Sequence, residues 1–81
     1  MNLEALAEAR KVIGVKQVTK LLKRQGAQAV FIAEDADDCV TEPIKGICEA
    51  QGIELTSIAT IKELGAACGI EVGAAVVAIL K

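Results

Sequence analysis

Two short runs of this chain are apolar at every position, and they restrict the possible folds more than any other feature. They are AVFIA, residues 29–33, and AAVVAIL, residues 74–80. The first combines β-branched residues with continuous hydrophobicity, which is typical of a strand covered on both faces. The second predicts a final buried strand of the same kind. A sheet that contains such strands needs helices on both of its sides.

The remaining segments supply those helices and two further strands. Apolar residues recur at helical spacing in several of them. We expect helices at residues 2–10, 15–25 and 60–68, a helix that begins at Thr41 and Pro43 and ends at Gly52, and strands at 12–14 and 53–58. The order αβαβαβαβ predicts an α/β fold, a three-layer α/β/α sandwich, as a single domain over residues 1–81.

Residues with special backbone or capping roles mark the expected helix ends. Gly26 is expected to close the second helix in the left-handed conformation. Thr60 and Glu63 have the spacing of a capping box. Gly65, Gly69 and Gly73 follow a helix rather than open one, so they predict a glycine cap and a tight loop instead of a phosphate-binding loop.

Composition agrees with an unaided hydrophobic core. Of the 81 residues, 53% are hydrophobic. Cys39, Cys48 and Cys68 are odd in number and lack C-x-x-C spacing, so they predict buried or half-buried thiols in a reducing cytoplasm. The apolar stretch 64–80 is short for a membrane span and contains Glu71 and three glycines. We therefore expect a cytoplasmic monomer that does not contact a membrane.

Charge is strongly segregated along the chain although the net charge is only −2. Residues 10–24 contain six Lys or Arg residues and no acid, whereas residues 25–81 contain three basic and nine acidic residues. Within the expected second helix, Lys16, Gln17, Lys20, Lys23 and Arg24 fall opposite Val18 and Leu22. A solvated helix face is the simpler interpretation, but solvated faces usually mix the two signs of charge. The pattern therefore favours a polyanionic partner.

The residue types narrow the kind of nucleic acid. The chain has no Trp or Tyr, and its one Phe, Phe31, lies in a buried strand, so no aromatic stacking platform is available. Lys and Gln side chains at a helix end can reach purine edges. Because the A-form groove is too narrow for side chains, the expected target is distorted RNA.

Catalytic and metal sites are not indicated. Without histidine the usual general base near neutral pH is missing, and neither a nucleophile elbow nor a P-loop is present. The acidic run EDADD, residues 34–38, fails the calcium-loop spacing and instead suits the N-terminus of a helix. We expect no enzyme activity, no metal and no cofactor.

Three blocks in order, GVKQVTK, VFIAEDAD and LGAACGIEVGAA, resemble the kink-turn RNA-binding family of ribosomal proteins (the L7Ae and L30e group), in particular its small bacterial members. The similarity covers about residues 3–80. It implies a four-stranded mixed sheet between helices. It also implies a site made by the turn from Gly14 to Lys20 and by the loop before the last strand.

The resemblance assigns roles residue by residue. Gly14 and Lys20 match a family turn that reads G-T-N-E-x-T-K and meets tandem sheared G·A pairs. Lys16 and Gln17 replace its Asn and Glu. Asp37 matches an acidic residue near a flipped-out nucleotide. The full expected RNA-binding set is Gly14, Val15, Lys16, Gln17, Lys20, Lys23, Arg24, Asp37, Ile70, Glu71, Val72, Gly73 and Ala74.

The expected function is recognition and stabilisation of kink-turns, in association with the ribosome. The expected partner is RNA that contains this motif, either ribosomal RNA or a riboswitch. Two alternatives stay open. The domain could be the RNA-recognising partner of a modification enzyme that acts in trans, or a protein-interaction module that presents its basic face to an acidic protein.

Overall fold

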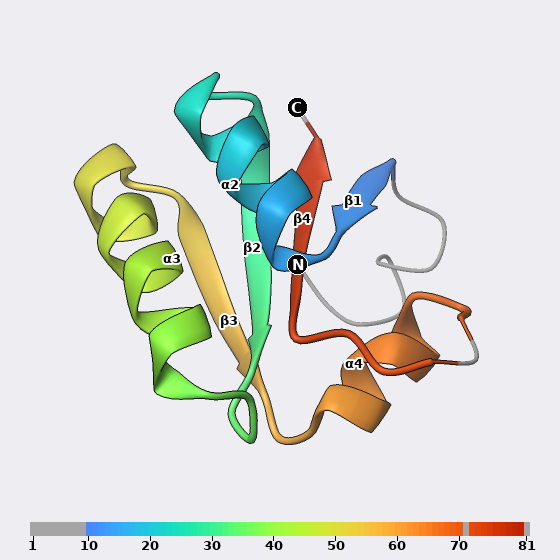
Figure 1. Cartoon of the computed structure of the whole chain (residues 1–81). Helices are drawn as coiled ribbons and strands as arrows, with labels where there is room; N and C mark the ends of the chain where they lie inside the picture. The colour runs from blue at the N-terminus through green and yellow to red at the C-terminus, as the bar shows by residue number, and fades with distance from the viewer. Residues whose placement is uncertain (1–9, 71, 81) are drawn as a thin grey trace.

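Three helices and four strands make up the described part of the chain. The computed structural model describes residues 10–70 and 72–80, so the helix expected at 2–10 lies almost wholly outside them. The elements are β1 (Lys11–Ile13), α2 (Val15–Lys23), β2 (Ala27–Ala33), α3 (Asp38–Gln51), β3 (Glu54–Ile58), α4 (Ile61–Ala67) and β4 (Val76–Leu80) (Figure 1). Every predicted strand is present within the described residues, and no strand end differs from its predicted position by more than two residues.

The four strands form one mixed sheet, which confirms the predicted fold. Their order is β1-β4-β2-β3. The central strand β4 runs antiparallel to both of its neighbours, β1 and β2, whereas β2 and β3 are parallel. Figure 1 shows β4, drawn in red, between β1 and β2.

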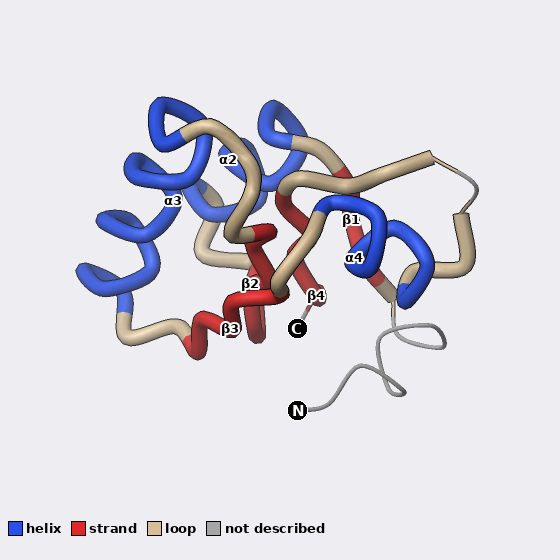
Figure 2. The backbone as a smooth tube through the Cα atoms, turned by 90° about the horizontal axis from the view of Figure 1, so that it is seen from below, coloured by secondary structure: helices blue, strands red, loops and turns tan. Residues whose placement is uncertain are grey.

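Alternate side chains of β2 enter two different cores. Val30 and Ile32 pack against buried residues of α2 and α3 on one face of the sheet. Phe31 and Ala33 pack with Leu64 of α4 on the other face. Figure 2 shows α2 and α3 side by side over the sheet. The continuous hydrophobicity of this strand therefore reflects burial on both of its sides, as the sequence predicts.

The end of α2 corrects one prediction. The left-handed residue is Gln25, with φ of 55°, and not Gly26. The N–H of Gln25 donates to the Leu22 carbonyl at 3.0 Å, and that of Gly26 donates to the Leu21 carbonyl at 3.0 Å. This pair of bonds is a Schellman motif, in which the first residue past the cap takes the left-handed conformation. The helix ends at Lys23, and this end point sets the motif one residue earlier than we predicted.

Replacing Gln25 with glycine is expected to stabilise the domain by about 0.5–1 kcal/mol. A left-handed conformation costs a residue with a β-carbon roughly 1–2 kcal/mol, and the greater freedom of glycine in the unfolded chain offsets part of that gain. Gly52→Gln is the reciprocal control, because Gly52 has φ of 67° and open space around it. We expect it to destabilise the domain by a similar amount. Urea unfolding of both variants measures the two changes, and a loss of stability in Gln25→Gly would contradict this account.

The start of α3 corrects a second prediction. The helix begins at Asp38, with Asp37 as its N-cap, and Pro43 lies inside it instead of at its start. Proline removes the N–H that would bond to the carbonyl four residues earlier, here that of Cys39. Both Cys39 and Pro43 are exposed, so water can solvate this carbonyl. Gly52 ends the helix, as predicted, and it takes the left-handed conformation.

The cysteines are free thiols in two different environments. Cys48 and Cys68 are buried, and burial raises the pKa of both thiols. Cys39 is exposed, which corrects the prediction that all three are at least half-buried. Its position in the first turn of α3, on the solvent side, accounts for the difference.

Candidate functional site

The sheet topology collects the predicted site segments at one end. Strands β1, β2 and β3 finish at this end, and β4 starts there, as the pairs Ile13↔Val77 and Ile32↔Val76 show. The turn into α2, the turn from β2 to α3 and the loop from α4 to β4 all leave from it. This is the lower end of the sheet in Figure 1. Segments far apart in sequence are thus brought together.

The turn into α2 is fixed directly to the first residue of β4. Gly14 donates its N–H to the Val76 carbonyl at 3.0 Å, and its own carbonyl accepts from the Val18 N–H at 3.0 Å. Its φ of 104° is a conformation that residues with a β-carbon rarely adopt. Glycine is therefore required for the helix to begin so close to the sheet.

The outer face of α2 carries the predicted basic residues. Val18 and Leu22 are 0% exposed, and Val15 is half-buried. The opposite face is exposed and consists of Lys16, Gln17, Lys20, Lys23 and Arg24. Within residues 10–70 and 72–80, no acidic side chain forms an ion pair with this face of α2. An ion pair of 3.7 Å is found instead within α3, between Lys45 and Glu42. The acidic side chains of the described residues thus leave the positive charge of α2 without an ion-pair partner.

The turn between β2 and α3 uses its acidic residues in a way that the sequence does not reveal. Asp37 is exposed at the N-cap of α3, but its side chain makes no capping hydrogen bond. Asp35 instead accepts a hydrogen bond on Oδ1 from the Ile61 N–H at 2.7 Å. The carboxylate therefore caps α4, a different helix from the one that it precedes.

The loop before β4 is packed tightly against α4. Ala74 donates its N–H to the Ile61 carbonyl at 3.1 Å. A β-carbon on Gly73 would collide with the Ile61 side chain, and one on Gly65 would collide with the Val72 backbone carbonyl. These two glycines are required by packing. The predicted glycine cap of α4 is Gly69, with φ of 78°.

Only part of this loop reaches the surface. Val72 is 71% exposed, Gly73 is exposed and Ile70 is half-buried. Ala74 is 3% exposed and belongs to the core. This corrects the prediction that its side chain contacts RNA, because a buried side chain is not available at the surface. Glu71 lies outside the described residues.

An open pocket of about 430 Å³ lies between α4 and this loop. Its lining residues are Asp35, Ile61, Lys62, Ala66, Ile70, Val72 and Gly73. Apolar side chains form most of the wall, and Asp35 and Lys62 contribute opposite charges. Lys62 was absent from the predicted set, although the Thr60 cap, which accepts from the Glu63 N–H at 3.0 Å, places it in the first turn of α4.

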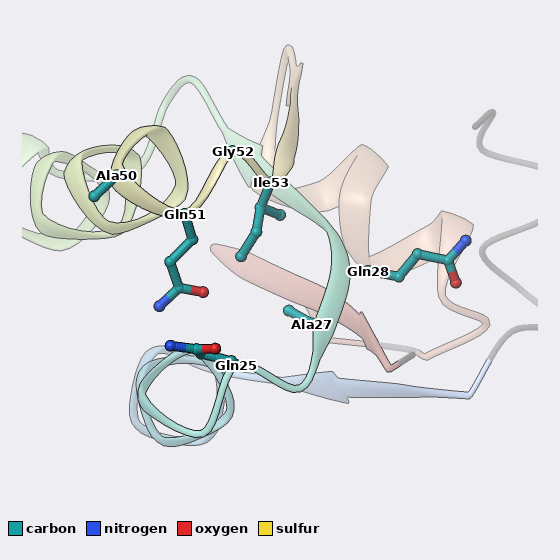
Figure 3. A pocket seen from close by; sticks show the side chains of 7 residues that line it. All are labelled: Gln25, Ala27, Gln28, Ala50, Gln51, Gly52 and Ile53. Carbon is teal, nitrogen blue, oxygen red and sulfur yellow. The ribbon is translucent and has the colours of Figure 1, made fainter.

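A second pocket, of about 520 Å³, lies at the opposite end of the sheet. Figure 3 shows the side chains of Gln25 and Gln51 pointing toward one another there. Gln51 donates from Nε2 to the Leu22 carbonyl at 2.7 Å, so this oxygen accepts a second hydrogen bond besides the one from the Gln25 N–H. We interpret this pocket as the place where the ends of α2 and α3 are tied together.

Membrane-spanning helices and metal-binding clusters are absent from the part of the chain that the structure describes. It contains no helix that is both long and apolar enough to cross a membrane. Within the same residues, no three His, Cys, Asp or Glu side chains lie close enough together to hold a metal ion.

Comparison with known proteins decides the family. A model of the ribosomal protein L7Ae/L30e/S12e/Gadd45 family matches residues 2–81. The chain belongs to this family. It is 42% identical to RNA-binding protein YbxF of Geobacillus stearothermophilus over 82 aligned positions that cover 100% of both chains. An RNA-binding protein of Bacillus pumilus is 38% identical over 81 residues, which cover 99% of each chain.

A solved structure agrees with this assignment. The 15.5kD RNA binding protein of Giardia lamblia superposes with a TM-score of 0.85 at 29% identity. The match covers 98% of this chain and 68% of the Giardia protein. The resemblance inferred from the three sequence blocks is therefore confirmed at the level of family and fold.

Proposed function

We propose that this protein binds RNA and recognises kink-turns, with the N-terminal half of α2 and the loop before β4 as its two contact surfaces. The observation that carries the proposal is the exposed basic face of α2, which forms no ion pair with an acidic side chain of residues 10–70 or 72–80 and begins at the same sheet end as that loop. The names of the relatives, which describe them as RNA-binding proteins, support the choice of RNA over another polyanion.

The first turn of α2 suits an anionic partner for two reasons. It contains no acidic residue, and its free N–H groups give this end of the helix a positive partial charge. Lys16 and Lys20 are four residues apart and so lie above one another on the same face. Phosphates or guanine edges placed at this turn would meet both lysines, and Gln17 can donate to and accept from a purine edge.

The pocket beside α4 suits a base that has left the helical stack. Ile70 and Val72 offer apolar surface to the flat face of a base, and Lys62 and Asp35 offer polar groups to its edge. An undistorted duplex keeps its bases stacked and has none to place there. A kink-turn, with a flipped-out loop nucleotide and tandem sheared G·A pairs, would engage α2 and this pocket together. The ribosomal name of the family favours ribosomal RNA as the carrier of the motif.

The test compares two RNAs of equal length, one with a kink-turn and one an uninterrupted duplex, over a series of salt concentrations. We expect tighter binding to the kink-turn by at least tenfold. We also expect the logarithm of the affinity to fall with the logarithm of the salt concentration with a slope of roughly 3, at nearly one unit for each phosphate contacted. Equal affinity for both RNAs would refute kink-turn recognition. A flat salt response would remove the role of the basic face and favour the protein-interaction alternative.

A further inference from the structure

We propose that Asp35 is a positioning residue of the RNA-binding surface. In this assignment its carboxylate holds the start of α4, and through Ile61 the loop before β4, in place relative to the turn that follows β2. The effect on RNA binding rests on the proposed function. The structural link itself does not, and it is testable without RNA.

The hydrogen bond from Ile61 to Asp35 joins two segments that are 26 residues apart in sequence. The N–H of Ile61 is the first of α4 and has no partner within the helix. A carboxylate is a stronger acceptor for such a group than a neutral oxygen. Thr60 satisfies a second N–H of the same turn, that of Glu63. The start of α4 is thus held by one neighbouring and one distant side chain.

Ile61 also contacts the loop before β4, and so connects this loop to Asp35. Its carbonyl accepts from the Ala74 N–H at 3.1 Å, and its side chain fills the space beside Gly73. Asp35, Ile61 and Gly73 all line the pocket beside α4. A shift of Ile61 would therefore change the shape of the pocket and the position of Val72.

The turn that carries Asp35 is itself anchored to the sheet. Glu34 donates its N–H to the Ile58 carbonyl at 2.7 Å, and Ala36 donates to the Ala33 carbonyl at 3.2 Å. The backbone on both sides of Asp35 is thus held in place by hydrogen bonds. Asp37, which we expect to approach the RNA, lies two residues further along the same turn. The hydrogen bond between Ile61 and Asp35 therefore links the turn that carries Asp37 to the start of α4.

Three variants separate this role from a simple effect of charge. Asp35→Ala removes both the acceptor and the negative charge, and Asp35→Asn keeps an acceptor oxygen but loses the charge. Glu34→Ala removes the same charge from the neighbouring exposed residue, which contributes only a backbone hydrogen bond. We expect Asp35→Ala to raise the Kd for a kink-turn RNA about tenfold relative to Glu34→Ala. The two variants should bind a plain duplex equally, and Asp35→Asn, which keeps a weaker acceptor, should lie between the wild type and Asp35→Ala.

Amide hydrogen exchange provides the measurement without RNA. Asp35→Ala should speed exchange at Ile61 and Ala74 and leave Val18, which is bonded to Gly14, unchanged. Thermal melts check that each variant is folded. Unchanged exchange at Ala74 would overturn the link, whatever the RNA result. An effect of Asp35→Asn as large as that of Asp35→Ala would overturn the acceptor role. Faster exchange together with a wild type that does not prefer kink-turns would support the link and refute the proposed function.

Discussion

Gly65→Ala is expected to destabilise the domain by about 2 kcal/mol, although alanine is the better helix former. The added β-carbon would collide with the backbone carbonyl of Val72, and a backbone atom cannot rotate away as a side chain can. For a domain of this size we expect the melting temperature to fall by roughly 10 °C. Relief of the collision requires α4 and the loop before β4 to move apart.

Gly46→Ala is the matched control for this prediction. Gly46 also lies inside a helix, but it is exposed and no atom lies within 4 Å of the position that its β-carbon would occupy. Alanine there should stabilise the domain by about 0.5–1 kcal/mol. Thermal and urea unfolding of the two variants should therefore show changes of opposite sign. The same sign in both would contradict the described packing of α4 against its loop.

Lys20→Ala is expected to weaken binding to a kink-turn RNA by roughly 1–3 kcal/mol, and binding to a plain duplex much less. Lys20 lies one turn beyond Lys16 on the exposed face of α2, in the last turn of the helix but closer than Lys23 to the end that is tied to β4. A base edge presented there would lose a direct donor. Neither Val18 nor Leu22 is disturbed, so the stability of the fold should not change.

Lys23→Ala serves as the control for Lys20→Ala. It removes the same charge about 4.5 Å further along the helix axis, away from the sheet end. We expect it to weaken binding to both RNAs alike, as a phosphate contact does. Binding isotherms of both variants on both RNAs provide the measurement. Equal losses in the two variants on the two RNAs would reduce Lys20 to a phosphate contact.

Much of the fold could be predicted because burial is visible in the residue pattern. Val30 to Ala33 are apolar without interruption because each face of β2 meets a different core. Gly52 and Gly69 end their helices where predicted, because glycine adopts the left-handed backbone conformation at a lower energetic cost than residues with a β-carbon. The strand order is different in kind, since no local pattern records which strands pair. The family resemblance implied a four-stranded mixed sheet, but neither it nor the residue pattern predicted which strands are neighbours.

The errors arise where a local preference is overridden. Pro43 favours a helix start, but its exposed position lets the helix continue through it. The position of Gln25 favours glycine, but the burial of Val18 and Leu22 determines where α2 ends and so places Gln25 there. Asp35 looks like a cap for the next helix and caps a distant one instead. Contacts between segments that are distant in sequence decide each of these cases, and one sequence does not display them.

The strand order also governs when the domain can form during synthesis. β4 is the last of the four strands to be made, yet it lies between β1 and β2 and joins them. Until residues 76–80 have left the ribosome, β1 has no described strand to pair with. Before that point the only strand pair of the described sheet that can form is the parallel pair β2 and β3, which α2 and α3 can cover. The four-stranded sheet can therefore be completed only at a late stage, and the segments proposed to contact RNA come together at its end only then.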